Sequence, residues 1–315
     1  MKNNWTTLDH AAKIFIAGAS RTETQVFRFS CELRESINPE SLQEALDFTL
    51  DHFPSYRVVL KKGFFWYYLE ESQLRPLALP ETKRLCCDMG CSHTKKLLFE
   101  VTYFNSRINL EVYHVLSDGT SAMQFFKTLI SEYISLAYHE APPSLEVDAS
   151  HAQSKDDSYD RYYTGEKCKG EKPKPACFIQ GFRYGENFLR NITGQLPAKE
   201  VLALAKEYRT TVTVLLCACL ISAIGQNATA RERRKPIVLS VPVDLRNYFP
   251  SASARNFFGA IRVSYQWQRN ENSLEDIIGT LNDQFREMLT EEYLGSQIDE
   301  QSAAEFCTEL TAMIK

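Results

Sequence analysis

Apolar and polar positions in the first part of the chain follow a strand pattern and then a helix pattern. Residues 24–33, TQVFRFSCEL, alternate between apolar and polar side chains, which predicts a strand. Residues 38–54 then place Leu42 and Leu46 on one helical face, with Pro39 in the first turn. The chain therefore opens with a strand followed by a helix.

Two hairpins are predicted next. Residues 56–62 and 64–71 are strand-like runs separated by Gly63. Residues 95–104 and 107–115 form a second pair of such runs. Apolar residues at helical spacing then predict a helix over residues 120–138.

The second half of the chain mixes helices and strands. Residues 140–186 are rich in Pro, Gly, Lys and Asp and read as a connector. The predicted elements around that connector are a helix over 120–138, a strand near 188–196, helices over 197–208 and from 211, strands over 235–245 and 256–267, and a helix over 273–289. This order lacks regular βαβ alternation, so the expected fold class is α+β.

Composition narrows the function classes. The chain has 315 residues, 44% of them hydrophobic and 24% charged, and its net charge is −4. That charge provides no general attraction to nucleic acid or to an anionic membrane surface, so neither is an expected partner. The longest apolar run, residues 212–224, is too short to span a bilayer and predicts a buried core helix.

Cysteine usage indicates a reduced protein. The nine cysteines are an odd number, Cys217 and Cys219 lie inside the apolar run, and no secretory signal precedes them, so we expect a cytoplasmic location. One segment, CCDMGCSH, gathers possible zinc ligands: Cys86, Cys87, Cys91 and His93. Its spacing fits no familiar zinc pattern, so we expect a polar loop and no bound metal.

The segment EVYHVLSDGTSAMQFF, residues 111–126, carries the candidate chemistry. His114 ends a predicted strand, and Asp118 and Gly119 follow in a turn, where we expect an exposed imidazole. Imidazole titrates near pH 6.5, so it can act as a general base at neutral pH. Asp118 would either orient the imidazole or hold the turn through an ion pair or backbone hydrogen bonds, and Gly119 would permit a tight exit into the helix. A purely structural turn with a capping aspartate is the alternative.

This segment resembles the H-H-x-x-x-D-G active-site segment of the coenzyme A-dependent acyltransferase superfamily. That superfamily includes chloramphenicol acetyltransferase and the condensation domains of peptide synthetases. A second segment, VPVDLRNYFPSASARNFFG at residues 241–259, is similar to one in bacterial alcohol acetyltransferase-like proteins. The resemblance extends over nearly the whole chain.

The resemblance implies an architecture. Two lobes like those of chloramphenicol acetyltransferase would enclose a tunnel, with an N-terminal lobe over residues 1–140, a connector over 141–186 and a C-terminal lobe over 187–315. Relatives in this superfamily have further strands after the segment that corresponds to the last residues of this chain. The second lobe is therefore expected to be truncated, which would weaken coenzyme A binding.

The resemblance also implies roles for single residues. His114 matches the catalytic second histidine, and Tyr113 stands where many relatives have the first, on the substrate tunnel. Asp118 would pair with an arginine, for which Arg246 is the candidate. Asn256 is expected to line the tunnel, and a strand-end asparagine bonded to backbone is its alternative.

The implied reaction is acyl transfer, with acetyl as the expected group, from a coenzyme A thioester to a small-molecule alcohol or amine. Coenzyme A would be a co-substrate, and no bound cofactor is expected. Residues 231–236, RERRKP, are a candidate for holding its phosphates, although a charged loop is usually just solvated. Two alternatives stay open: a non-catalytic relative that binds a ligand or partner, and a condensation-type enzyme that takes its acyl group from a carrier protein.

Overall fold

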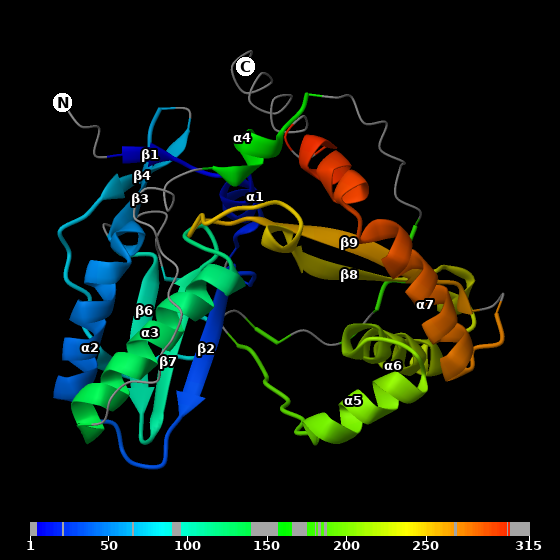
Figure 1. The fold of residues 1–315 in the computed structure, drawn as a ribbon, viewed down its shortest axis with the longest axis horizontal. Helices are drawn as coiled ribbons and strands as arrows, with labels where there is room; N and C mark the ends of the chain where they lie inside the picture. Colours follow the sequence, from blue (N-terminus) through cyan, green and yellow to red (C-terminus); the bar gives the residue numbers. More distant parts are fainter. Residues whose placement is uncertain are drawn as a thin grey trace.

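A computed structural model describes most of the chain. The described residues are 5–20, 22–64, 66–89, 96–139, 157–165, 175–179, 181, 184–185, 188–267, 270–300 and 302. They form two lobes that lie side by side, with the N-terminal lobe on the left of Figure 1 and the C-terminal lobe on the right. Each lobe has its own hydrophobic core.

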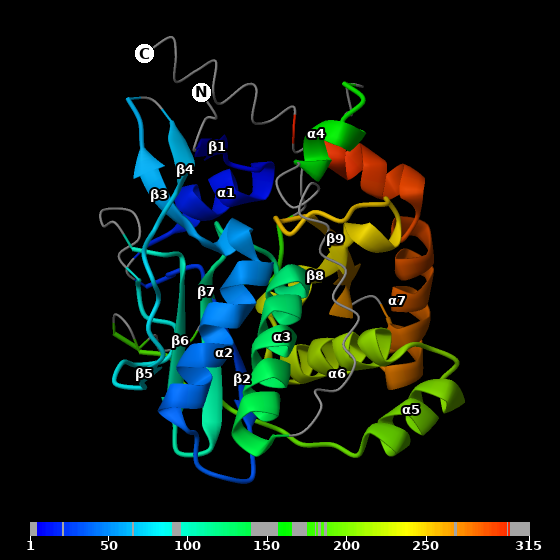
Figure 2. The ribbon, with the colours of Figure 1, turned by 60° about the vertical axis from the view of Figure 1, so that its left-hand side comes forward.

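The N-terminal lobe is built on a four-stranded sheet with the order β2-β7-β6-β5. Its strands are β2 (Val26–Glu32), β5 (Leu79–Pro80), β6 (Phe99–Phe104) and β7 (Arg107–Tyr113). The central strands are antiparallel, and β5 joins β6 in parallel. Helices α2 (Pro39–His52) and α3 (Gly119–Tyr138) lie side by side over one face of this sheet (Figure 2).

A smaller sheet lies beside the first, with the order β1-β4-β3. Its strands are β1 (Trp5–Thr7), β3 (Val58–Lys62) and β4 (Tyr67–Glu71), and a short 3-10 turn, η1 (Pro54–Tyr56), precedes β3. The predicted hairpin across Gly63 is present, with β4 beginning later than expected. The sequence pattern did not indicate β1 or the helix α1 (His10–Gly18) that follows it.

The C-terminal lobe contains a two-stranded antiparallel sheet in the described residues. Strands β8 (Ile237–Asp244) and β9 (Phe258–Tyr265) pair along their whole length, and helices α6 (Val212–Asn227) and α7 (Leu274–Met288) pack against them. The other elements are α5 (Ala198–Glu207), the 3-10 turns η2 (Glu232–Arg234) and η3 (Leu245–Asn247), and a helical stretch over 291–300.

Helix α1 lies between the two lobes. Ala12 is part of the N-terminal core, whereas Ala11 is part of the C-terminal core. Asp9 caps the helix by accepting a hydrogen bond from the Ala12 N–H at 2.7 Å. Residues of α1 therefore help to join two separate cores.

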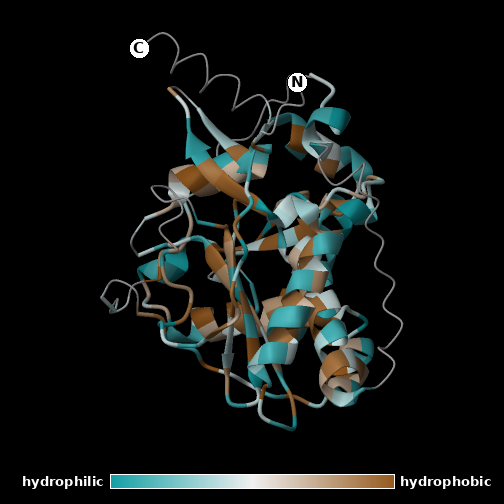
Figure 3. Cartoon of the chain, turned by 90° about the vertical axis from the view of Figure 1, so that its left-hand side faces the viewer, coloured by the Kyte–Doolittle hydropathy of each residue, from teal (hydrophilic) through white to brown (hydrophobic). Residues whose placement is uncertain are grey.

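Brown, apolar residues follow the strands and inner helix faces in Figure 3, whereas the outer faces are largely teal.

The polar connector contains a short helix that the sequence pattern did not indicate. Helix α4 (Ser158–Tyr162) places Tyr159 in the C-terminal core. The Tyr159 hydroxyl donates to the carbonyl oxygen of Phe258 at 2.6 Å and accepts from the Phe258 N–H at 3.2 Å. This part of the connector is thus docked on the start of β9.

The prediction of a strand near residues 188–196 is wrong. These residues are exposed and have no regular secondary structure, and Ile192 is 84% exposed. A strand requires a neighbouring backbone to accept and donate its hydrogen bonds. In the described part of the lobe, the only sheet consists of β8 and β9, so this apolar stretch has no strand partner there.

The apolar run at residues 212–224 forms α6, but the helix is only partly buried. Val214, Ala218 and Ile221 face the core, while Leu216 and Leu220 are exposed. Within the described residues no single helix has the length and hydropathy of a membrane span, and α5 and α6 reach them only as a pair bent by 84°.

Candidate active site

The turn after β7 holds the candidate base. The His114 N–H donates to the carbonyl oxygen of Gln25 at 2.9 Å, and the Leu116 N–H donates to that of Tyr113 at 2.8 Å. Helix α3 begins at Gly119, and Asp118 caps it by accepting from the Ser121 N–H at 3.0 Å. The predicted change from strand to helix around His114 is therefore present.

The imidazole of His114 is partly buried among aromatic rings, in contrast to the exposed ring that we expected. The Phe15 ring stacks on it with centroids 4.0 Å apart, and Phe27 and Phe258 lie at 4.8 and 5.7 Å. Burial lowers the pKa of His114 below its usual 6.5, and the contact with Asn256 opposes this shift. The ring is consequently neutral at pH 7, as a general base requires.

Asn256, and not Asp118, is the side chain bonded to the imidazole. Asn256 Oδ1 lies 3.3 Å from His114 Nδ1. The Asp118 carboxylate instead accepts from Arg246 Nη1 and from the Phe257 N–H, both at 2.8 Å. Of the two roles left open for Asp118, these contacts fit the one that holds the turn.

Arg246 connects the two lobes. It extends from η3 in the C-terminal lobe to Asp118, and it also donates to Asp244 at 3.2 Å. Its remaining acceptors are the Ser121 hydroxyl and the carbonyl oxygens of Ser253, Arg255 and Phe257. The ion pair expected between Arg246 and Asp118 is thus present. Arg246 also holds the loop between η3 and β9, residues 248–257, through that loop's carbonyl oxygens.

A second acid and arginine pair joins the same loop to the N-terminal lobe. Arg255 Nε lies 3.9 Å from Asp9 Oδ2, and its guanidinium also donates to the carbonyl oxygen of Thr7. Burial raises the pKa of Asp9 to about 6, and Arg255 opposes that rise. No motif or spacing in the sequence had pointed to Asp9 as a site residue. Its position just before a helix is typical of a cap, but no sequence signal indicated its burial.

Tyr113 is the last residue of β7, and Gly119 is the first residue of α3. Tyr113 is 6% exposed and belongs to the N-terminal core, so its role on a tunnel stays a prediction. Gly119 is exposed, its φ is not positive, and a Cβ there would meet no atom within 4 Å. The exit that Gly119 was expected to permit therefore shows no conformational requirement for a glycine.

Replacing Gly119 by alanine is expected to keep or slightly raise the stability, by about 0–1 kcal/mol, because alanine favours helices and the site has room. Thermal unfolding of the two proteins measures this. A clear loss of stability would mean that the glycine conformation matters after all. A loss of activity at unchanged stability would indicate that substrate passes close to this backbone.

The tunnel implied by the resemblance stays a prediction. One cavity among the described residues has a volume of about 360 Å³ and lies against the strands of the N-terminal sheet. Its lining includes Arg28, Leu79, Lys83, Phe99 and Glu111. His114 is not among the lining residues, so this cavity is separate from the candidate base.

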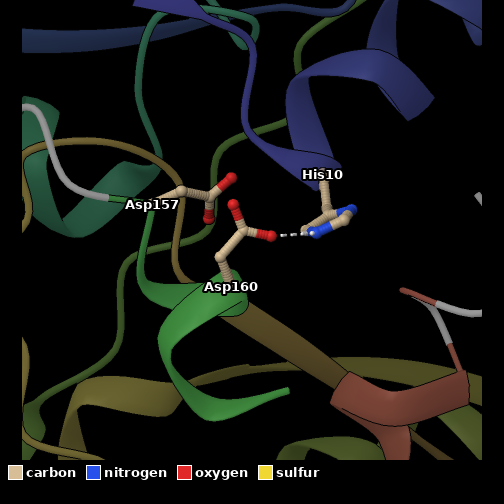
Figure 4. Close-up of side chains that lie close together, drawn as sticks. All are labelled: His10, Asp157 and Asp160. Carbon is tan, nitrogen blue, oxygen red and sulfur yellow. Dashed lines mark hydrogen bonds and ion pairs between the residues drawn. The ribbon is translucent and has the colours of Figure 1, made fainter. Parts of the chain in front are cut away.

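Two groups of side chains resemble metal ligands. In the cysteine segment, Cys91 and His93 lie outside the described residues, and burial raises the pKa of the Cys86 thiol to about 11. In the other group, ligand atoms of His10, Asp157 and Asp160 all lie within 4.8 Å of one another (Figure 4). His10 Nε2 is 3.2 Å from Asp160 Oδ1, so this contact links α1 to α4 across the lobes.

The basic segment 231–236 has a structural function in part. Arg233 donates to the carbonyl oxygens of Gly225 and Gln226, both at 3.0 Å. These carbonyls belong to the last turn of α6, where a cation is favourable. Contact of this segment with coenzyme phosphates stays a prediction.

Comparisons with known proteins give the fold. No protein-family model and no curated protein matches the chain. The epimerization domain from the third module of tyrocidine synthetase B matches with a TM-score of 0.63 and 15% identity, covering 94% of this chain and 74% of that one. The first condensation domain of the calcium-dependent antibiotic synthetase matches with a TM-score of 0.65 and 16% identity, covering 91% and 75%.

Polyketide synthase associated protein 5 from Mycobacterium tuberculosis is also similar, with a TM-score of 0.60 and 17% identity over 93% of this chain and 74% of that chain. Identities this low show the fold alone. The chain therefore has the two-lobed α+β fold of condensation domains, which confirms the fold class that the sequence resemblance implied. The lobe bounds stay a prediction.

Proposed function

We propose that this two-lobed chain transfers an acyl group from a thioester to an alcohol or an amine, with His114 as the general base. The observation that carries the proposal is the position of the His114 imidazole, which is partly buried where the lobes meet and has Nδ1 3.3 Å from Asn256 Oδ1. Burial lowers its pKa, which favours the neutral form that a base requires. If Nδ1 carries the hydrogen, Nε2 has the free electron pair with which a general base accepts a proton.

The proposed reaction is direct. The acceptor hydroxyl or amine gives its proton to Nε2 of His114 as its oxygen or nitrogen bonds to the thioester carbonyl carbon. The carbon–sulfur bond then breaks, and the imidazolium returns the proton to the leaving sulfur. No acyl group is attached to the protein, so the only proton carrier required is the histidine.

We propose a coenzyme A thioester as the donor, with acetyl as the acyl group and a small alcohol or amine as the acceptor. The similarity of segment 241–259 to alcohol acetyltransferase-like proteins favours this donor. A carrier-protein thioester is the second candidate, favoured by the likeness to a condensation domain of an antibiotic synthetase. A ligand-binding protein without catalysis is the third.

The experiment measures thiol release from two kinds of donor, acetyl-coenzyme A and an acetyl thioester of a phosphopantetheine carrier protein, with a panel of alcohols and amines. Reactions without acceptor serve as the control for hydrolysis. We expect acceptor-dependent release from the coenzyme A thioester. Release from the carrier alone would replace the donor, and no release from either donor would leave a binding function.

The pH dependence of kcat/KM is expected to have a single acidic limb. Because the pKa of His114 is lowered below 6.5, the base is neutral above that pH and the rate should be level there. Below its pKa the imidazole is protonated, and the rate should fall about tenfold per pH unit for one ionisation. Initial rates between pH 5 and 8 measure this. With an alcohol acceptor, which does not titrate in this range, a rate that still rises between pH 7 and 8 would show that another group is the base.

A further inference from the structure

Asp9, Asn256 and His114 form a continuous chain of contacts across the two lobes. Asn256 Nδ2 donates to the Asp9 carboxylate at 3.2 Å and to the carbonyl oxygen of His114 at 3.1 Å. Asn256 Oδ1 lies 3.3 Å from His114 Nδ1. Asp9 and Asn256 are each 1% exposed, so solvent does not compete for these contacts.

The chemistry of these contacts determines how the Asn256 amide is oriented. Its nitrogen carries two hydrogens, and both face acceptors, one a carboxylate and the other a carbonyl. The reversed amide would place its oxygen against both acceptors and lose both bonds. Asn256 Oδ1 therefore has to face the imidazole. Because that oxygen can only accept, His114 Nδ1 has to be the donor and carry the hydrogen.

We propose that Asp9 is a positioning residue that acts through Asn256 to hold His114 in the tautomer with hydrogen on Nδ1. In that tautomer Nε2 has the free electron pair that a general base uses. Asp9 and His114 belong to the N-terminal lobe and Asn256 to the C-terminal lobe. The tautomer of His114 is therefore fixed only when the two lobes are in contact. The inference deepens the proposed function and rests on it for its catalytic meaning.

Several charged groups act on Asp9. Arg255 stabilises its carboxylate, Asp157 of α4 disfavours it, and Asp157 in turn faces His10 and Asp160 (Figure 4). An ionised carboxylate at Asp9 is a stronger acceptor for the Asn256 amide than a neutral group is.

The test is the tautomer of His114, measured by NMR of the protein labelled with ¹⁵N-histidine, with a His114→Gln variant to assign its signals. We expect wild type at pH 7.5 to carry hydrogen on Nδ1, with Nε2 unprotonated. Asp9→Asn should add the other tautomer and lower kcat about 10- to 100-fold, as for other partners that fix a histidine tautomer, with KM unchanged. Asparagine remains able to cap α1.

Asp157→Asn is the matched control, because within the described part of the chain the Asp157 carboxylate caps α4 and makes no hydrogen bond to Asn256, so its loss should leave the tautomer unchanged. Hydrogen on Nε2 in wild type would overturn the proposal, as would an unchanged tautomer and kcat in Asp9→Asn. The wild-type spectrum decides even if a variant does not fold. The tautomer is also measured without any acyl donor, so failure of the proposed reaction is recognised separately.

Discussion

Replacing His114 by alanine is expected to lower the rate of acyl transfer about 10²–10⁴-fold, the usual contribution of a general base. The variant loses the only proton carrier in the proposed reaction, while the contacts of Asp118 with Arg246 and Phe257 do not involve the imidazole. Steady-state rates with the best donor and acceptor pair measure the effect.

The His114→Ala variant should also lose about 1 kcal/mol of stability, because the ring stacks on Phe15. Thermal unfolding measures this second effect. His52→Ala is the control, since His52 is exposed on α2 and its ring lies against Phe48 one turn earlier, through the Phe48 carbonyl oxygen and the Phe48 ring. Near-normal turnover in a folded His114→Ala protein would rule out the proposed base.

Breaking the pair between Arg246 and Asp118 is expected to have the largest effect on stability. Both side chains are largely buried, so removing one leaves a buried charge, at a cost of about 3–5 kcal/mol. Arg246→Ala should cost more than Asp118→Asn, because Arg246 also holds the carbonyl oxygens of Ser253 and Arg255. Denaturant unfolding of both variants gives the free energies.

A double-mutant cycle separates the shared interaction from the rest. The Asp118→Asn and Arg246→Ala double variant should lose less than the sum of the two single losses, because both remove the same contact. The control is Arg286→Ala, which breaks an ion pair with Asp283 whose side chains are 78% and 79% exposed, and which should cost about 0–0.5 kcal/mol. Strict additivity in the buried pair would show that the two residues are not energetically coupled.

Local patterns predicted much of the N-terminal lobe. The alternation in β2 and the second hairpin, and the helical spacing after Asp118, depend on residues close in sequence, so the pattern alone was sufficient. The pairing of Arg246 with Asp118 came from the resemblance, because no periodicity relates residues so far apart.

Other features depend on long-range partners that a pattern does not contain. Asp9 reads as an ordinary helix cap, and only the folded chain brings it to Asn256 and Arg255. The apolar stretch 188–196 resembles a strand, yet the described residues offer it no strand partner. Tyr159 is buried although it lies in the polar connector. The pattern did not indicate this, because one buried side chain is too little to give an apolar periodicity.

The bond between the Phe257 N–H and Asp118 Oδ2 has its donor in one lobe and its acceptor in the other. Phe257 is fully buried, so its amide hydrogen can exchange with solvent deuterium only when the lobes separate or the loop unfolds locally. The exchange rate of this one amide hydrogen therefore reports how often the candidate site opens. Comparing its exchange rate with kcat would reveal whether the protein opens in every catalytic cycle or only rarely.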